Sequence, residues 1–402
     1  MAVYTTKLYE RAMDHMHRRM LFVDDLGPGP ICSIGSVIAN HKQANEPFHW
    51  VYGDDEDLGV NITFVAPSGF AKSHTMKQFI HKEKGICPFK STFRGKITEP
   101  GFVGTVSKDG DQIFGDAFHY SEGILAFNEI ANLFCSQQQQ EQSSELINQV
   151  MEALTERRVS KRLANGIVDY PTLVTVWGGI QPRRFDFSQG LGRRFCFICR
   201  NWTQEDMRAF KLLRKAREKI IKLDLSEVQS FRTEIATALE TFNASEVKWD
   251  ISLLDYIEKK CESHLQMQLL EKVVIGRETL NQYDQDTLVI HDDDANRKLV
   301  EDISRMQSMV AEGSDVSMMV NVLQGLGKEQ ATMGELWNIF RGYNYTLNVF
   351  TDLVATCERL RVIQRSFSGN RQYIRLRDDL QDRAGHQQTA EEIIAALAEY
   401  NK

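Results

Sequence analysis

Two apolar segments of the chain each end in polar residues, and this pairing constrains the fold more than any other feature. The first segment runs from Asn61 to Val65 and leads into a loop of small residues that ends in Lys72-Ser73. The second runs from Gly123 to Phe127 and ends in Asn128-Glu129. In a strand–loop–helix of the first kind, backbone N–H groups surround a phosphate at the helix N-terminus. The lysine then reaches the terminal phosphates and the serine hydroxyl holds Mg²⁺, so the pair of segments predicts a nucleoside-triphosphate site.

The loop departs from the usual pattern G-x-x-x-x-G-K-[ST] at both glycines, where this chain has Ala66 and Ala71. Alanine before the lysine still lets the backbone wrap a phosphate if its φ is negative. The alternative is an ordinary strand–turn–helix with a coincidental Lys-Ser pair. We expect contact with ATP from the residues of the whole loop: Ala66, Pro67, Ser68, Gly69, Phe70, Ala71, Lys72, Ser73 and His74.

Composition and charge limit the cellular setting and the partners. No apolar run approaches membrane-spanning length and the N-terminus lacks a signal-peptide core, so we expect a cytoplasmic or nucleoid-associated protein without membrane contact. The formal net charge of −7 argues against nonspecific coating of nucleic acid but allows a local basic site. Cys196 and Cys199 have metal-ligand spacing, yet they lie in an apolar run without a second pair, which favours a buried strand.

Strands and helices alternate from residue 61 to about residue 200, and this alternation predicts a parallel α/β sheet. Further strands are expected at Thr172–Trp177 and Phe195–Ile198. From about residue 204 the pattern becomes mostly helical, which we interpret as an all-helical lid with helix starts at Asp224, Ser226 and Asp292. The predicted division is an N-terminal helix and lead-in (1–60), an α/β core (61–203), a lid (204–309), a C-terminal domain (310–378) and a tail helix (379–402).

Two hairpins are expected within the core. Residues 101–115 are rich in glycine and turn around Lys108-Asp-Gly-Asp111. Residues 157–168 turn at Asn165-Gly166, the strongest short hairpin signal, and carry four basic side chains. An exposed turn without a binding role is the alternative for the second hairpin.

The C-terminal domain reads as three helices, at 316–326, 332–340 and 347–359, followed by two short strands around Ser368-Gly-Asn370. This order is typical of a winged helix. Arg365 and Arg371 are the expected DNA contacts among six arginines that suit phosphate binding: Arg359, Arg361, Arg365, Arg371, Arg375 and Arg377. A winged helix can also dock on protein, so the sequence leaves both partners open.

The order of these parts resembles a known family. Ala71-Lys72-Ser73 is similar to the phosphate loop of the minichromosome maintenance (MCM) helicases, AAA+ ATPases that commonly read Ala-Lys-Ser there. The inserted hairpin, the Gly123–Glu129 strand and the basic hairpin are similar in order and spacing, and Gly192-Arg-Arg-Phe195 resembles the family's Ser-Arg-Phe. The resemblance covers about residues 60–200, and the lid and winged helix match only in kind. It implies an AAA+ P-loop core without the family's N-terminal zinc and oligonucleotide-binding domain.

The resemblance implies a role for each residue of the phosphate site. Lys72 would bind phosphate, Ser73 would bind Mg²⁺, and Glu129 would polarise the attacking water. Asn128 departs from the family, which has aspartate beside the metal. The neutral amide predicts slower hydrolysis, or a metal held mainly by Ser73 and the nucleotide.

The resemblance also implies contacts between subunits and with nucleic acid. Arg194, or its neighbour Arg193, would reach the ATP of the next subunit, which requires an oligomer, expected to be a hexamer. Gln181 is the substitute for the family's asparagine after the Thr172–Trp177 strand. The hairpin residues expected to grip single-stranded DNA in a central channel are Lys108, Lys161 and Arg162.

Three classes of function follow from these patterns. The first is a ring-forming ATP-dependent motor that translocates on DNA, helicase-like and active in replication. The second is an ATP-binding assembly switch for a replication or transcription complex; Asn128 favours it, and residues 101–106 faintly resemble the activator loop of bacterial enhancer-dependent transcription ATPases. The third is a chelatase-like or remodelling ATPase that acts on protein.

Overall fold

The chain forms two compact units in a computed structural model, Met1–Cys199 with Leu223–Gln307 and Arg200–Lys222 with Ser308–Lys402. The predicted lead-in, the core and most of the predicted lid fall in the first unit. The structure describes residues 7–45, 57–66, 72–95, 98–130, 144–181, 194–200, 208–209, 211–212, 225–261, 263–311, 319, 322–323, 326, 328, 330–342, 347–359, 363–369 and 371–376.

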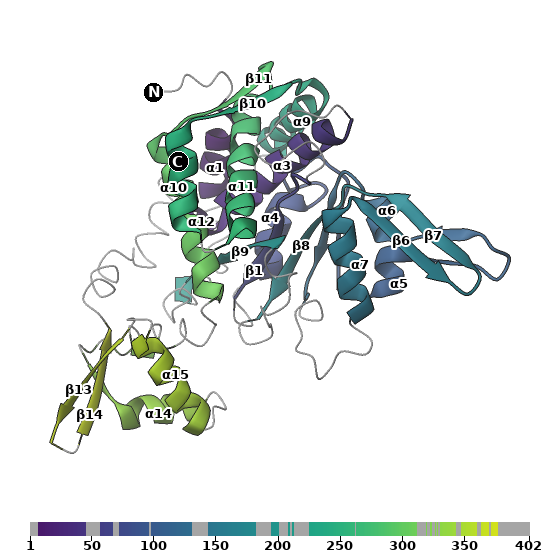
Figure 1. The fold of residues 1–402 in the computed structure, drawn as a ribbon. Helices are drawn as coiled ribbons and strands as arrows, with labels where there is room; N and C mark the ends of the chain where they lie inside the picture. The colour runs from purple at the N-terminus through teal and green to yellow at the C-terminus, as the bar shows by residue number, and fades with distance from the viewer. Residues whose placement is uncertain are drawn as a thin grey trace. The chain divides into compact units, whose positions relative to one another are not determined.

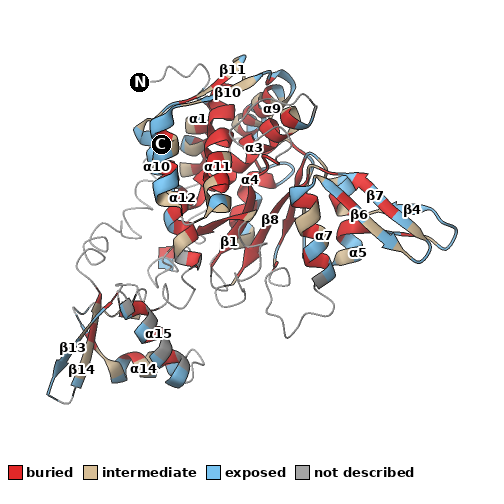
Figure 2. Ribbon diagram, viewed as in Figure 1, coloured by how far each residue is buried: buried red, intermediate tan, exposed pale blue. Residues whose placement is uncertain are grey.

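A five-stranded parallel sheet lies at the centre of the first unit (Figure 1). Its strands, in order across the sheet, are β2 (Ser91–Arg94), β5 (Ile124–Phe127), β8 (Thr175–Ile180), β1 (Asn61–Val65) and β9 (Phe195–Cys199). The inner strands are buried along their whole length, as continuous apolar runs in a parallel sheet require (Figure 2). The predicted parallel α/β sheet is therefore confirmed.

Helix α4 (Lys72–Ile80) follows β1 and packs on the sheet through aromatic side chains. Phe79 of α4 lies edge-on to Trp177 of β8, with ring centroids 6.1 Å apart, and Phe64 of β1 lies 6.3 Å from the same tryptophan. All three side chains are buried. Aromatic pairs at this separation add to the free energy of burial, so α4 is held firmly against the sheet.

The N-terminal segment packs into the first unit as helix α3 (Pro28–Asn45), against helix α11 (His264–Asn281). A β-carbon on Gly35 would lie 1.9 Å from the carbonyl oxygen of Gly276, so the two backbones touch. In the structure Pro28 begins α3, because proline suits the first helical position, where its missing N–H is not needed.

One face of α3 supplies hydrogen bonds to the chain that enters β1. Ser33 Oγ donates to the carbonyl of Val60 at 2.5 Å, and the Val60 N–H donates to Ser36 Oγ at 2.9 Å. Asn40, one turn further on, accepts from the Leu58 N–H at 2.9 Å. These serine and asparagine side chains lie three and four residues apart, hence on one helix face. They satisfy buried backbone groups that lie outside the sheet ladder.

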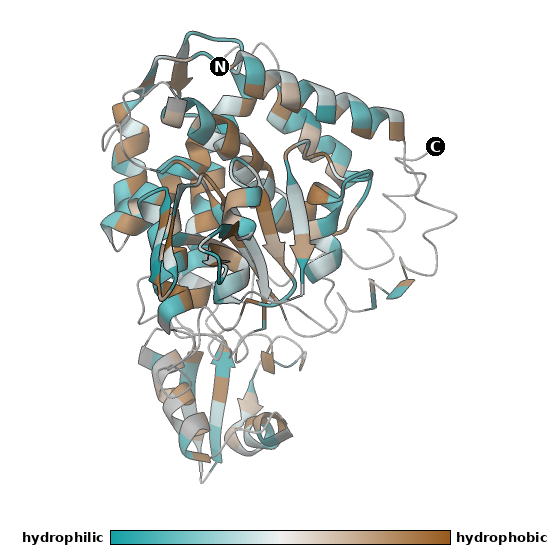
Figure 3. Ribbon diagram, turned by 90° about the vertical axis from the view of Figure 1, so that its right-hand side faces the viewer, coloured by the Kyte–Doolittle hydropathy of each residue, from teal (hydrophilic) through white to brown (hydrophobic). Residues whose placement is uncertain are grey.

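The predicted all-helical lid contains strands as well. Helices α9 (Leu225–Thr241), α10 (Ile251–Lys260) and α12 (Asp294–Ala311) join α11, but β10 (Glu246–Trp249) and β11 (Thr287–Ile290) form a parallel pair. Both short segments are rich in β-branched and aromatic residues, which favour strands over helices. The outer helices alternate hydrophilic and hydrophobic residues along their length (Figure 3).

Helices α1 (Leu8–His17) and α9 hold the loop that follows α4. Arg19, just after α1, donates to Gln78 Oε1 of α4 at 3.2 Å and to the carbonyl of Lys84. Arg232 of α9 donates to the carbonyl of Gly85 at 3.0 Å. His15 joins the two helices, since its Nδ1 lies 3.1 Å from the Glu227 carboxylate and its Nε2 lies 3.1 Å from Arg19 Nη1.

His15 predicts a pH dependence of stability. Burial, followed by the charge of Arg19, lowers the pKa of His15, and Glu227 opposes the shift only in part. The unfolded chain therefore binds more protons than the folded chain as pH falls below about 6.5, so stability declines there. We expect the urea midpoint to fall between pH 7.5 and 5.5, and to fall less in His15→Gln. An unchanged pH slope in that variant would contradict the assignment.

The second unit has a three-stranded antiparallel sheet, in the order β12 (Ala331–Thr332), β14 (Arg371–Leu376), β13 (Ile363–Ser368). Helices α14 (Met333–Gly342) and α15 (Leu347–Arg359) pack on it. The strands expected around residues 368–370 are present, and Gly369 has a φ of 59°, which favours glycine. The buried core includes Leu336, Phe340, Phe350, Val354, Cys357, Ile374 and Leu376.

Candidate nucleotide-binding site

Helix α4 begins with the two residues on which the phosphate-loop prediction depends. Lys72 Nζ donates to the carbonyl of Ala66 at 2.7 Å, which brings together the two ends of the loop. Ser73 Oγ donates to Asn128 Oδ1, which follows β5. Residues 67–71 lie outside the described residues, so their predicted role in ATP binding stays a prediction. His74 is exposed, and its Nε2 lies 2.9 Å from Gln78 Nε2.

The strand order explains how the two predicted segments meet. Because the strands are parallel, the carboxyl ends of β1, β8 and β5 lie at one edge of the sheet. β8 lies between the other two, so the ends of β1 and β5 are about 10 Å apart, twice the spacing of neighbouring strands. Gln181, which follows β8 and is partly exposed, is at this same edge, and its predicted role stays a prediction.

Gly178 and Gly179 make room at the end of β8. A β-carbon on Gly179 would lie 2.7 Å from the carbonyl oxygen of Asn128 and 3.4 Å from Lys72 Cε. A β-carbon on Gly178 would lie 2.5 Å from Ile130 Cδ1. In the structure the missing side chains let Lys72 and Asn128 cross the end of β8, and no local sequence pattern reveals this.

Glu129 carries an unsatisfied acceptor beside Asn128. Its side chain is partly buried, and its Oε1 is buried with no hydrogen-bond partner in the part of the chain that the structure describes. Buried carboxylate oxygens rarely stay without a donor or a cation. Hydroxyl, amide and carboxylate oxygens are also the ligands that Mg²⁺ prefers. Ser73, Asn128 and Glu129 therefore fit a magnesium–triphosphate group at this edge.

Arg194 lies at the opposite edge of the sheet. The next residue, Phe195, pairs with Asn61 at the start of β1, whose five residues put about 13 Å between its first and last Cα atoms. Arg194 Nε donates to Thr155 Oγ1 at 2.9 Å, and partial burial lowers the pKa of the guanidinium. The structure therefore separates Arg194 from Lys72 within one chain. Arg193 lies outside the described residues.

Both predicted hairpins of the core are present. β3 (Gly104–Val106) pairs with β4 (Gln112–Phe114), and β6 (Arg158–Leu163) pairs with β7 (Gly166–Pro171). With α5 (Glu99–Val103), α6 (Asp116–His119) and α7 (Ser144–Thr155) they form an arm beside the sheet (Figure 1). The hairpins pack through three aromatic rings, Phe114, Phe118 and Tyr170, whose centroids lie 4.0 to 5.5 Å apart.

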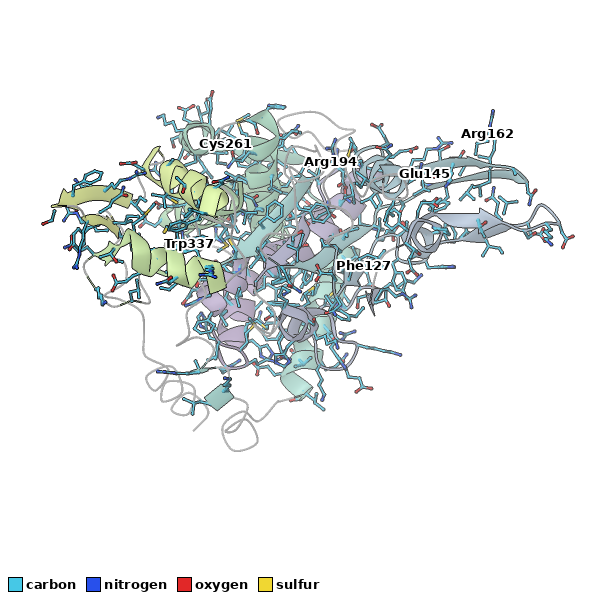
Figure 4. All side chains as sticks on the ribbon, turned by 90° about the horizontal axis from the view of Figure 1, so that it is seen from below. Phe127, Glu145, Arg162, Arg194, Cys261 and Trp337 are labelled. Atoms are coloured by element: carbon cyan, nitrogen blue, oxygen red, sulfur yellow. The ribbon has the colours of Figure 1, made fainter. Side chains whose placement is uncertain are left out.

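The three basic residues expected to grip DNA differ in their surroundings. Lys108 and Arg162 are exposed, and Arg162 points outward from the arm in Figure 4. Lys161 is only 10% exposed, because it is paired with Glu145 at 2.7 Å and with Glu99. Residues 99–118 and 157–171 together carry five basic and five acidic side chains, so these two segments have no net charge. DNA binding by the arm stays a prediction that depends on Lys108 and Arg162.

The described cysteines do not form a metal site. Cys196 and Cys199 lie in β9, and burial raises the pKa of each thiol to about 12. Among the residues that the structure describes, no cluster of three or more histidine, cysteine or acidic side chains could hold a metal ion. The buried-strand interpretation of this pair is confirmed.

The two arginines expected to contact DNA in the second unit lie on its hairpin. Arg371 is exposed at the start of β14. Arg365 of β13 is paired with Glu358 of α15 at 2.8 Å. Of these two arginines, only Arg371 is exposed, and Arg365 is already paired with a carboxylate.

Comparisons with other proteins do not identify a family for this chain. Within the described part of the chain, no helix has the length and apolar character that a membrane crossing needs. No protein-family model matches the sequence, and no curated protein is similar to it.

Proposed function

We propose that the chain is an ATP-dependent motor of the MCM-like AAA+ type that assembles into a ring and translocates on DNA. One observation carries the proposal: Ser73 bonds to Asn128 at the carboxyl edge of a parallel sheet, where open α/β sheets bind their ligands, and Lys72 and Glu129 are the adjoining residues. The α/β core is consistent with a P-loop ATPase. The lid and the winged helix are part of the proposal. Helices α9–α12 support the lid, and the β12–β14–β13 sheet supports the winged helix.

In the proposed reaction each residue has a separate task. Lys72 Nζ would exchange the Ala66 carbonyl for phosphate oxygens, and Ser73 Oγ would exchange Asn128 for the metal. Bound Mg²⁺ would neutralise charge that builds up on the phosphates. Glu129, whose Oε1 has no donor among the described residues, would accept a proton from the attacking water or orient it. Asn128 keeps an oxygen at the site but adds no negative charge.

The position of Arg194 determines how it would act. At the edge opposite Lys72, it could reach a bound triphosphate only on a neighbouring chain, in a head-to-tail arrangement. Such an arginine stabilises charge on the transferred phosphoryl group in trans. Homo-oligomers, expected to be hexamers, would then be required for turnover.

A mixing experiment tests this proposal. Lys72→Ala and Arg194→Ala should each reduce ATP turnover at least about 100-fold. In an equal mixture, about one interface in four combines an intact Lys72 with an intact Arg194, so turnover should reappear in the mixture. Arg297→Ala is the matched control, because Arg297 is an exposed arginine of α12 that pairs with Asp292 and has no proposed contact with ATP or DNA. An Arg194→Ala variant as active as wild type would remove the trans-acting arginine.

Asn128 favours an assembly switch as the second candidate function. Ser73 already bonds to the amide oxygen of Asn128, and binding of magnesium–ATP would break that contact. Position 128 then offers the metal a neutral amide where a carboxylate would bind it more strongly. A switch would form rings with ATP yet turn over slowly, and Asn128→Asp would then raise turnover. Fast hydrolysis in wild type, stimulated by single-stranded DNA, would instead favour the motor.

A further inference from the structure

The hairpin of the second unit has one apolar face and one polar face. Residues that pair across antiparallel strands lie on the same face, and neighbours along a strand alternate. Ile363 pairs with Leu376, and both are buried in the core of the unit. The opposite face therefore carries three other pairs, which are Gln364 with Arg375, Ser366 with Tyr373, and Ser368 with Arg371.

This opposite face, here called the wing face, combines positive charge with an aromatic ring. Arg371, Tyr373 and Arg375 follow one another on it along β14, the middle strand, and successive members are about 7 Å apart. Ser366 and Ser368 are exposed beside them and add hydroxyl groups. Residues 363–369 and 371–376 include three arginines and no acidic residue. The wing face therefore suits a polyanion that also offers flat rings.

Two acidic side chains near the hairpin, among the residues that the structure describes, are already paired with cations. Glu335, next to Thr332 of β12, is paired with Lys328 at 3.0 Å, and hydrogen bonds from Thr332 and that lysine lower its pKa to about 2. Glu358 is paired with Arg365, which lies on the apolar face of the hairpin. Neither carboxylate therefore cancels the charge of Arg371 and Arg375.

Arg375 is also oriented before any ligand binds. Its Nη2 and Nε donate to Gln364 Oε1 at 2.7 and 3.1 Å, across the pair of strands. A guanidinium held in this way loses less side-chain entropy when it binds a phosphate. The exposed hairpin tip has a second aromatic residue, Phe367, which is 73% exposed but lies on the other face.

We propose that the wing face binds single-stranded nucleic acid, with Tyr373 stacking on a base and with Arg371 and Arg375 contacting the phosphates on either side. Tyr373 can stack on the flat face of a base only when that base is unpaired, because base faces in a duplex are covered by their neighbours. The proposal deepens the proposed function, on which it rests for the class of partner. On this proposal, the second unit holds single-stranded nucleic acid whether or not ATP is bound.

Fluorescence anisotropy with a labelled oligothymidine and the full chain, without nucleotide, tests the proposal. Tyr373→Leu should weaken binding about tenfold or more, because stacking is lost, and should leave the salt dependence unchanged. Tyr373→Phe should bind like wild type. Arg371→Ala and Arg375→Ala should each reduce the slope of log affinity against log salt by about 0.7.

Two matched controls separate the wing face from other surfaces. Phe367→Leu removes an exposed aromatic ring from the other face, and Arg341→Ala removes an exposed arginine from α14. Both should bind the oligonucleotide like wild type. Equal losses in Phe367→Leu and Tyr373→Leu, equal affinity for duplex and single strand, or no binding at all would overturn the proposal. Retained binding in Lys72→Ala, which lacks the proposed ATP contact, would separate the wing face from the ATPase.

Discussion

Glu129→Gln is expected to reduce ATP turnover by about 10² to 10⁴-fold, the usual contribution of a general base. The substitution keeps the size of the side chain and leaves an oxygen at the site, but it removes the charge that accepts or orients a proton. Because Lys72 and Ser73 are untouched, ATP affinity should stay close to that of wild type. Steady-state hydrolysis and equilibrium binding of a fluorescent ATP analogue, both with magnesium, measure the two quantities.

Glu83→Gln is a suitable control for this prediction. Glu83 is exposed in the loop after α4, so its loss should change neither turnover nor affinity. Wild-type turnover in Glu129→Gln would show that the orphan oxygen of Glu129 has no part in hydrolysis. Equal loss of ATP affinity and turnover would instead assign Glu129 to binding.

The sequence was sufficient to predict two inner strands of the sheet, β1 and β5, and the polar residues that follow them. The apolar run before Lys72 and the run before Glu129 have the length and flanks of buried strands, and these local patterns predicted β1 and β5. Neither pattern contains the order of strands across the sheet. The position of β8 between them depends on pairing of segments more than one hundred residues apart.

Other features escaped prediction because they depend on contacts that are distant in sequence. In the sequence, the serines and asparagine of α3 are indistinguishable from other polar residues. Their role depends on contact with the chain before β1, which only the fold brings against them. Lys161 read as a free basic residue, since nothing local shows that Glu99 and Glu145 surround it. Charge counts along a sequence therefore overestimate the positive charge that a folded hairpin presents.

The largest expected loss of stability comes from Arg277 in α11. Its guanidinium is 3% exposed and is paired with Glu10 of α1 at 2.6 Å and with Glu278, which is fully buried, at 2.5 Å. It also donates to Asn296 of α12 at 2.9 Å and lies 5.4 Å from the ring centroid of Tyr9. One side chain therefore joins three helices from distant parts of the chain.

Arg277→Ala should lower the free energy of unfolding by about 3 to 5 kcal/mol, because it leaves Glu278 charged and buried without its main partner. Burial already raises the pKa of Glu278, and Arg277 opposes that shift. Without the arginine the folded chain would hold a proton on Glu278 that the unfolded chain releases as pH rises. The loss should therefore be smaller at pH 5 than at pH 8, as measured by urea unfolding followed by circular dichroism.

Two further variants separate a buried charge from simple packing. Arg297→Ala removes an exposed arginine that pairs with Asp292, and it should lower stability far less than Arg277→Ala does. Glu278→Gln combined with Arg277→Met removes both buried charges while it keeps most of the side-chain volume. The double variant should be more stable than Arg277→Ala at pH 8, since position 278 then carries no buried charge, and Glu10, which also loses its partner, is 39% exposed. If it is equally unstable at both pH values, the arginine acts through packing, and the ion pair does not determine how α1 is held on α11.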